Sequence, residues 1–199
     1  MKILVADYGV GNLHSISKAL EKAGAKVEIA SDVSMLVDAE CVVFPGVGAF
    51  GAAMERLNPI LPALRSRIAS GMPALGVCLG MQVMFEKSEE SSGDGVGVFK
   101  GEVKRLNAVR VPQMGWNDVS WEDDPMFDGV PRGSQFYYAN SYICRPVENV
   151  SIAETEYGER FPAAVRRVGL CGVQFHPEKS GPPGLRLLSN FVKIAEDSR

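Results

Sequence analysis

The stretch Gly76-Val77-Cys78-Leu79-Gly80 decides how this sequence is interpreted, because it places a cysteine between two glycines. The apolar run 74–77 predicts the end of a buried parallel strand, and residues 79–85 predict the start of a helix. A turn this sharp strains its central residue and leaves no room for Cβ atoms two positions before and after it, a clash that glycine removes. Cys78 is therefore a candidate nucleophile.

The helix start favours the reactive form of this thiol, since the positive end of the helix dipole and the free N–H groups stabilise a thiolate. A small buried cysteine in a glycine-rich turn explains the same five residues equally well. The rest of the chain has to separate these two interpretations.

Length and composition limit the remaining possibilities. A chain of 199 residues with 46% hydrophobic content fits one domain over residues 1–199. The net charge of −3, with acidic and basic residues interleaved, does not indicate a nucleic-acid-binding face. The apolar run at the N-terminus is too short for a signal peptide and meets an acidic residue too early. No apolar run is long enough to span a membrane. We expect a soluble, cytoplasmic protein.

The four cysteines do not suggest a metal or redox centre. They include no C-x-x-C pair, and a chain with only two histidines offers few ligands for a zinc site. Cys41, Cys144 and Cys171 lie in apolar strand-like runs, so we interpret them as core thiols that a cytosolic setting keeps reduced. No metal and no cofactor are predicted.

The first half of the chain alternates strands and helices. Strands are predicted at 2–7, 27–30, 41–44 and 74–77, and helices at 13–23, 49–57 and 59–70. This order is typical of an α/β fold, doubly wound, with a mostly parallel central sheet, helices on both faces and ligands at the carboxyl ends of the strands. Cys78 and the loop 45–48 both fall at such ends.

The second half is richer in short strands, which predicts an added antiparallel portion. Strands are expected at 96–99, 101–106, 134–143, 150–156, 161–167 and 170–175, with hairpin turns at 157–160 and 168–169. A surface loop is expected at 88–95 and a last amphipathic helix at about 184–194.

His176 is the candidate base for Cys78. It ends an apolar strand, and the following proline should hold the segment extended, so that Glu178, two residues on, points the same way and reaches the imidazole. Such a carboxylate would fix the tautomer and stabilise the imidazolium. A lone histidine at a strand end is ordinarily a surface residue, but the cysteine turn and the carboxylate reverse that expectation. His14 is interpreted as a partly exposed helix residue.

Two backbone segments could stabilise an oxyanion. One is the N–H of Leu79 beside the nucleophile, and the other is Pro45-Gly46-Val47-Gly48, where glycine lets a substrate approach closely. The segment 7–12 also contains glycines, but it lacks the third glycine and the acidic residue of a dinucleotide site. We interpret it as a tight turn with Asn12 capping the next helix.

Together these residues carry a family resemblance. Gly-Val-Cys-Leu-Gly-Met-Gln at 76–82 and Gln-Phe-His-Pro-Glu-Lys-Ser at 174–180 resemble class I (triad) glutamine amidotransferases. Asp-Tyr-Gly-Val-Gly-Asn-Leu-His-Ser at 7–15, Pro-Gly-Val-Gly-Ala-Phe at 45–50 and Pro-Gln-Met-Gly-Trp-Asn at 112–117 are similar, more narrowly, to the glutaminase subunits of imidazole glycerol phosphate synthase in histidine biosynthesis.

The resemblance implies a role for each matching residue. Cys78 would attack the side-chain amide of glutamine, His176 would transfer protons, and Glu178 would orient His176. The remaining matches are oxyanion-hole N–H groups at Val47 and Leu79, and glutamine-holding positions at Gly48, Gln82, Ser141 and Tyr142. The loop 45–48 is expected to rearrange on activation.

The resemblance also implies a partner, a (β/α)8-barrel cyclase that forms a heterodimer with the chain and uses the ammonia to make imidazole glycerol phosphate and an aminoimidazole carboxamide ribotide. Free ammonia in neutral water is quickly protonated and stops being a nucleophile, so a glutaminase without its own synthase domain should dock on one. The expected interface positions are Met114, Trp116, Asn117, Tyr137 and Lys179. Exposed Trp and Met side chains are also typical of interface centres.

Asn140 departs from the family pattern, because relatives commonly have histidine there, and an amide cannot be protonated. Two alternatives stay open from the sequence. The chain could be the glutaminase subunit of another synthase, such as one making anthranilate, or a cysteine-elbow binding or regulatory protein without glutaminase activity. Glu178 and Gln82 argue against the second.

Overall fold

A mixed sheet forms the centre of the computed structural model, which describes residues 1–9 and 13–198. Its eight strands follow the order β2-β1-β3-β4-β14-β13-β12-β9. Their bounds are β1 Lys2–Ala6, β2 Lys26–Ala30, β3 Val42–Phe44, β4 Ala74–Val77, β9 Ser120–Trp121, β12 Ser151–Tyr157, β13 Glu159–Arg167 and β14 Leu170–Val173. The strands from β2 to β14 pair in parallel, and the pairs from β14 to β9 are antiparallel. This confirms the predicted fold class.

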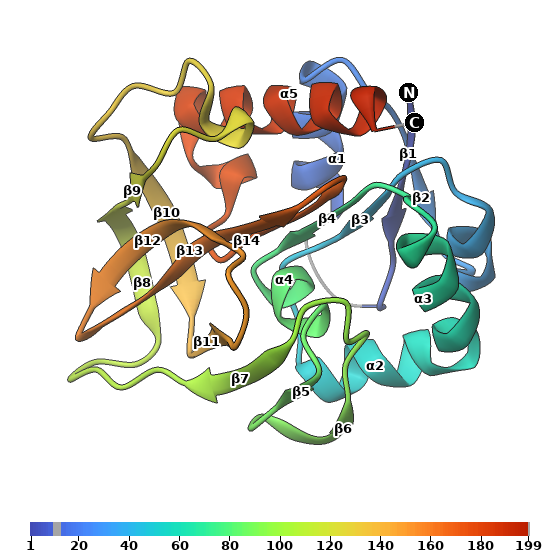
Figure 1. Cartoon of the computed structure of the whole chain (residues 1–199), viewed down its shortest axis with the longest axis horizontal. Coiled ribbons are helices and arrows are strands. Elements are labelled where there is room, and N and C mark those ends of the chain that lie inside the picture. The colour runs from blue at the N-terminus through green and yellow to red at the C-terminus, as the bar shows by residue number, and fades with distance from the viewer. Residues whose placement is uncertain (10–12, 199) are drawn as a thin grey trace.

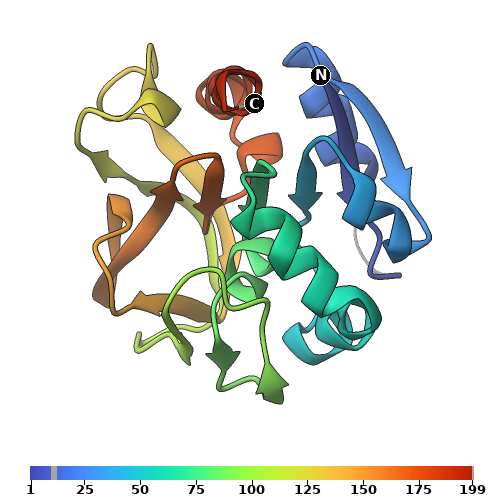
Figure 2. The same cartoon turned by 45° about the vertical axis from the view of Figure 1, so that its right-hand side comes forward.

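Helices cover both faces of the sheet (Figures 1 and 2). Their bounds are α1 Leu13–Lys22, α2 Phe50–Leu57, α3 Leu61–Ala69, α4 Leu79–Val83 and α5 Gly181–Asp197. Alternation along β1 explains the layering, since Ile3 and Val5 belong to the core beneath α1 and α5, and Leu4 and Ala6 belong to the core shared with α2, α3 and α4.

Two smaller sheets lie beside the central one. The first pairs β10 (Gln135–Asn140) with β8 (Gln113–Asp118), and the second has the order β11-β7-β5-β6. The strands of the second sheet are β5 Lys87–Ser88, β6 Ser91–Asp94, β7 Gly101–Arg105 and β11 Tyr142–Pro146. Short 3₁₀ turns complete the elements, η1 Val33–Asp38, η2 Asn58–Ile60, η3 Pro125–Phe127 and η4 Pro177–Lys179.

Several expected elements differ from the observed ones. The predicted strand 96–99 is wrong, because its N–H groups bond to the carbonyl oxygens of residues 83–85, at the end of α4 and just after it. These local hydrogen bonds take the place of a strand partner. The predicted loop 88–95 is instead the β5–β6 hairpin. The run 134–143 is broken at Ser141 into β10 and β11, and α5 begins three residues before the expected Gly184. The predicted cap at Asn12 lies outside the described residues.

The central strands bring the predicted site residues to one edge. β3, β4 and β14 are adjacent and parallel, so the segments that follow Phe44, Val77 and Val173 leave the sheet at the same side. These segments contain Gly46 and Cys78, and His176 follows β14. No helix among the described residues is long and apolar enough to cross a membrane.

Candidate active site

The turn after β4 holds Cys78 in a conformation that L-residues rarely adopt. Its φ is 47° and its ψ is −105°, and it is the only non-glycine residue in the described part of the chain with a positive φ. A Cβ on Gly76 would lie 2.5 Å from the carbonyl oxygen of Gly80, and a Cβ on Gly80 would lie 1.9 Å from that of Phe44. The two glycines therefore allow the turn, and strain of this kind gathers at active sites.

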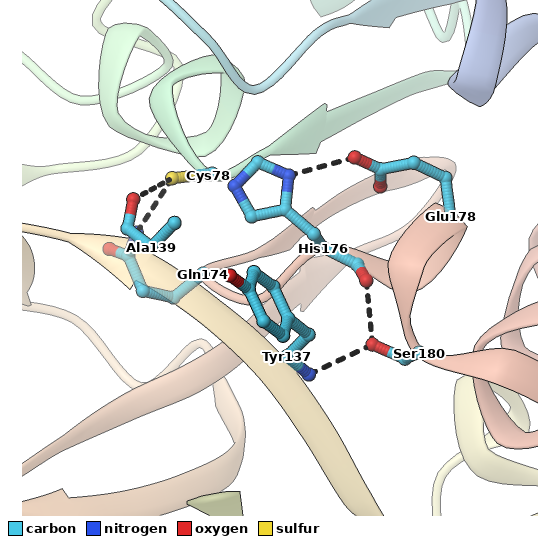
Figure 3. Close-up of polar contacts among 7 residues, drawn as sticks. All are labelled: Cys78, Tyr137, Ala139, Gln174, His176, Glu178 and Ser180. Atoms are coloured by element: carbon cyan, nitrogen blue, oxygen red, sulfur yellow. Dashed lines mark hydrogen bonds and ion pairs between the residues drawn. The ribbon is translucent and has the colours of Figure 1, made fainter. Parts of the chain in front are cut away.

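His176 and Glu178 lie beside Cys78 (Figure 3). The imidazole Nδ1 is 2.8 Å from Oε1 of Glu178, and the other ring nitrogen is on the side of Cys78. The side chains of His176 and Glu178 are only 1% and 7% exposed, so water competes little with this contact. The route that brings Glu178 to the ring differs from the expected one. Residues Pro177–Lys179 form a 3₁₀ turn instead of an extended segment, because the fixed φ of proline suits a first helical position.

His176 has a pKa displaced upward from its ordinary value. Burial lowers the pKa, but the hydrogen bonds and charges of Cys78 and Glu178 raise it more, and the result is a pKa of about 9. This upward displacement of the pKa favours the protonated imidazole at neutral pH. A cationic ring beside the sulfur favours the thiolate, and it holds a proton that a leaving group could take.

Ser180, for which the sequence pattern predicts no role, joins the backbone of His176 to strand β10. Its hydroxyl donates to the carbonyl oxygen of His176 (2.6 Å) and accepts from the N–H of Tyr137 (3.0 Å) (Figure 3). The N–H of His176 in turn donates to the carbonyl oxygen of Tyr137 (2.8 Å). The His-Pro-Glu-Lys-Ser sequence is thus a local frame that attaches the imidazole to β10.

A cavity of about 270 Å³ opens onto the sulfur of Cys78. Its lining residues are Gly46, Val47, Gly48, Cys78, Leu79, Gln82, Glu90, Ala139, Asn140, Ser141, Tyr142, His176 and Lys179. All four predicted glutamine-holding positions and both predicted oxyanion donors are in this set. A larger hollow of about 660 Å³ lies between α5 and the segment 121–132, and no predicted site residue lines it.

The loop after β3 passes close to Cys78 and His176. A Cβ on Gly46 would lie 2.8 Å from Cε1 of His176 and 3.1 Å from Cβ of Cys78, so only glycine fits without displacement. Gly48 has a φ of +123°, which also favours glycine. Glu90 also lines the cavity, but it lies on the β5–β6 hairpin, which the sequence pattern predicts as a surface loop. Its Oε2 accepts from the N–H of Phe50 (2.7 Å), at the start of α2 and two residues after Gly48.

The family model of glutamine amidotransferase class-I matches residues 4–195. The chain belongs to the class-I glutamine amidotransferase family. It is 46% identical to the imidazole glycerol phosphate synthase subunit HisH of Thermococcus kodakarensis, over 96% of this chain and 100% of that protein. It is 44% identical to the subunit HisH of Halobacterium salinarum, over 98% of this chain and 94% of that protein.

Solved structures of low sequence identity share the amidotransferase fold. A glutamine amidotransferase crystal structure superposes with a TM-score of 0.76 at 19% identity, over 97% of this chain and 98% of that chain. The structure of PurLQS from Thermotoga maritima superposes with a TM-score of 0.75 at 18% identity, over 96% of this chain and 97% of that chain.

Four of the five predicted interface residues of this amidotransferase share one surface, which we call the β8–β10 surface: Met114, Trp116, Tyr137 and Lys179. The first two side chains are 67% and 55% exposed. Trp116 pairs with Tyr137 across the strands, with ring centroids 6.1 Å apart, and Nζ of Lys179 lies 5.7 Å from the Tyr137 ring. Asn117 is on the other face of β8, where its amide donates to Thr155 and to the carbonyl oxygen of Glu156.

Asn140 lines the cavity and cannot carry the charge that a protonated histidine would have at this position. Its Nδ2 donates to the carbonyl oxygen of Tyr142 (3.1 Å), and the side chain is 4% exposed. The described residues include no group of three or more His, Cys, Asp or Glu side chains placed to hold a metal ion.

Proposed function

We propose that this chain hydrolyses glutamine to glutamate and ammonia with a Cys78, His176 and Glu178 triad. The observation that carries the proposal is the strained Cys78 beside a buried imidazole whose Nδ1 contacts Glu178. The Cys78 thiolate attacks the side-chain amide carbon and forms a tetrahedral oxyanion. His176 gives its proton to the nitrogen, the C–N bond breaks, and ammonia leaves a thioester on Cys78. Water, deprotonated by His176, attacks the thioester carbon, and the C–S bond breaks to release glutamate and restore the Cys78 thiolate beside protonated His176.

Backbone N–H groups of Val47 and Leu79 are the proposed oxyanion donors. Both residues line the cavity at the sulfur, and Leu79 begins α4. Donors of this kind act best when they are fixed before the charge develops. The close approach of Gly46 to the triad keeps the loop 45–48 within reach of the reacting carbon. Because Glu90 holds the start of α2, it also restrains the far end of this loop.

The cavity suits an amino acid with a terminal amide. Both amide hydrogens of Gln82 have partners, since Nε2 donates to the carbonyl oxygen of Tyr142 (3.0 Å) and to Oε1 of Gln174 (3.3 Å). We infer that Gln82 offers its remaining carbonyl oxygen to an N–H group of glutamine. Glu90 and Lys179 provide one charge of each sign at the lining, which complements the α-ammonium and α-carboxylate groups. Gly48, Ser141 and Tyr142 contribute backbone contacts.

The proposed partner is the (β/α)8-barrel cyclase of imidazole glycerol phosphate synthase, docked on the β8–β10 surface. The curated relatives are HisH subunits of that synthase. An exposed Trp–Met pair next to the site gives the partner an apolar anchor close to where ammonia is released. We further propose a single domain over 1–199, because one sheet runs through both halves and separates the two cores.

A glutaminase assay tests this function. Purified chain is incubated with glutamine alone, with the cyclase, and with the cyclase and its nucleotide ligand. We expect glutamate formation that rises in the last mixture and falls at least about a thousandfold in Cys78→Ala. Cys171→Ala is the matched control, because this buried thiol lies in β14 and should leave turnover unchanged. Absence of glutamate in all three mixtures would contradict the proposal. Activation by a different synthase, and not by the cyclase, would show that the proposed partner is wrong.

A further inference from the structure

The sulfur of Cys78 has a polar neighbour outside the triad. Gln174 is fully buried, and its Nε2 lies 3.5 Å from Sγ of Cys78, although the two residues are 96 positions apart (Figure 3). Gln174 is two residues before His176, on the segment that continues β14. The sulfur thus lies between the imidazole on one side and a carboxamide on the other.

The hydrogen-bond network fixes which end of the Gln174 carboxamide faces the sulfur. The carbonyl oxygen of Tyr142 can only accept, so the Gln82 atom 3.0 Å from it is the nitrogen. The same nitrogen is 3.3 Å from Gln174, and its partner there must be the oxygen Oε1. The amide nitrogen of Gln174 therefore points at Cys78 and donates to it.

The donor direction decides which form of the sulfur this residue favours. An N–H group interacts more strongly with a thiolate than with a thiol. A second polar neighbour of Sγ is the carbonyl oxygen of Ala139, at 3.8 Å. A carbonyl oxygen can only accept, so this contact favours the protonated sulfur. The shorter contact from Gln174 opposes this preference of Ala139 for the thiol.

We propose that Gln174 is a further catalytic residue, which donates a hydrogen bond to the Cys78 sulfur, stabilises its thiolate and is held in that orientation by Gln82. The inference deepens the proposed glutaminase function, because that reaction begins from the thiolate. It concerns the sulfur itself, however, so it can be tested without glutamine or a cyclase.

Other charged or titratable groups around the sulfur remain in place when Gln174 is changed. They are His176, Glu178 and Lys179 on the segment after β14, Glu90 on the β5–β6 hairpin, Tyr142 at the start of β11, and the buried thiol Cys144, whose pKa is raised by burial and by the charge of Cys78. A difference between the parent protein and a Gln174 variant therefore reports the amide donor.

The test is the pH dependence of Cys78 alkylation by iodoacetamide in the isolated chain, followed by mass spectrometry of the Cys78 peptide. In Gln174→Met the donor is lost at similar volume, and the pH of half-maximal rate should rise by about one unit. Gln174→Glu should raise it further, because a carboxylate repels the thiolate. Gln82→Met keeps the Gln174 donor but removes the hydrogen bond that orients it, so we expect a smaller rise in the pH of half-maximal rate.

Asn190→Leu is the matched control. Asn190 is also a buried carboxamide, with two donated bonds to the carbonyl oxygens of Met126 and Asp128, but it lies on α5 away from the sulfur. It should lose comparable stability and keep the parent alkylation profile. Gln174 variants that keep the parent profile would overturn the proposal, as would an equal shift in Asn190→Leu.

A second measurement needs no Gln174 variant to fold. In ¹⁵N-labelled parent protein, one glutamine side-chain amide should shift with the same pH midpoint as alkylation, and this titration should vanish in Cys78→Ala. If no glutamine amide follows the thiolate, the contact is absent and the proposal is wrong. If the alkylation profiles change as expected while glutaminase activity is lacking, the proposed function fails and this inference stands.

Discussion

At the scale of single residues, the proposed triad depends on opposing influences on the pKa of His176. Burial alone would lower the pKa of this imidazole, and the neighbouring Cys78 and Glu178 reverse that effect. Because the folded-state pKa is raised from 6.5 to about 9, the stability contributed by protonated His176 is complete below pH 6.5 and is lost as the pH rises through 9. The chemistry and the stability of the site therefore depend on the same proton.

Removing either neighbour should lower the pKa of His176. In Glu178→Gln and in Cys78→Ala one of the influences that raise it is lost, while burial, which lowers it, remains. We expect the imidazole of His176 to titrate at least about one pH unit below the parent in each variant. Imidazole ¹⁵N shifts measured against pH report this directly, with exposed His14 as the internal reference. An unchanged midpoint in both variants would show that neither group acts on the ring.

Residue motifs could be predicted from the sequence where neighbours along the chain form the geometry. Cys78 with its two glycines, and His176 with Glu178, are local patterns of this kind. The reason given for the second pattern was wrong, since the segment turns instead of extending, yet the spacing still brings the carboxylate to the ring. Glu90 and Gln174 contact Phe50 and Cys78, which lie 40 and 96 positions away in the sequence. Ser180 bonds to the nearby His176 but also to Tyr137, 43 positions away. No local pattern predicts these long-range contacts.

At the scale of elements, the contact between α4 and β3 sets the active-site turn. Gly80 packs against the backbone of Phe44, the last residue of β3, and the loop 45–48 follows directly. Bringing helix and strand this close places Cys78 and that loop side by side. Glycine at position 80 is therefore required by the packing of α4 against β3 as well as by the turn itself.

Gly80→Ala should damage both stability and activity. Its Cβ would lie 1.9 Å from a backbone oxygen that cannot move without shifting β3, so we expect a loss of about 2–3 kcal/mol in the free energy of unfolding and a large loss of turnover. Urea denaturation and the glutaminase assay check this.

Gly51→Ala is the control for this experiment. Gly51 lies in α2, and its added Cβ would meet only the small side chain of Ser91, at 3.2 Å. Alanine is also the better helix former, so stability should stay within about 1 kcal/mol of the parent. Equal effects of the two substitutions would contradict the packing explanation.

At the scale of the whole molecule, His176, the proposed base, is connected to the β8–β10 surface through hydrogen bonds and ring packing. Ser180 bonds to both His176 and Tyr137, and Tyr137 packs against Trp116 at the surface. A partner bound there would contact the strand from which the imidazole is held. This arrangement gives a physical route by which docking could affect the site.

Trp116→Ala should weaken the complex with the cyclase by about tenfold or more, because large aromatic anchors dominate interface energies. Val168→Ala is the control, since this apolar side chain is 83% exposed in the turn before β14, at the sheet edge opposite Cys78. The Val168→Ala variant should bind the cyclase with the same affinity as the parent protein. Titration calorimetry with the purified cyclase measures both, and equal affinities for parent and Trp116→Ala would place the interface elsewhere.

The sequence by itself determined the parallel first half, the strained turn at Cys78 and the family, because each depends on residues adjacent in the chain. Only the tertiary structure decided that 88–95 is a hairpin lining the site, that 96–99 locks onto the end of α4 instead of forming a strand, and that Gln174 meets the sulfur of Cys78. Such contacts join segments far apart in sequence, and their geometry is set by how strands pair and pack, which no local pattern records. The cysteine between two glycines marks the proposed nucleophile, and the fold supplies the groups that surround it.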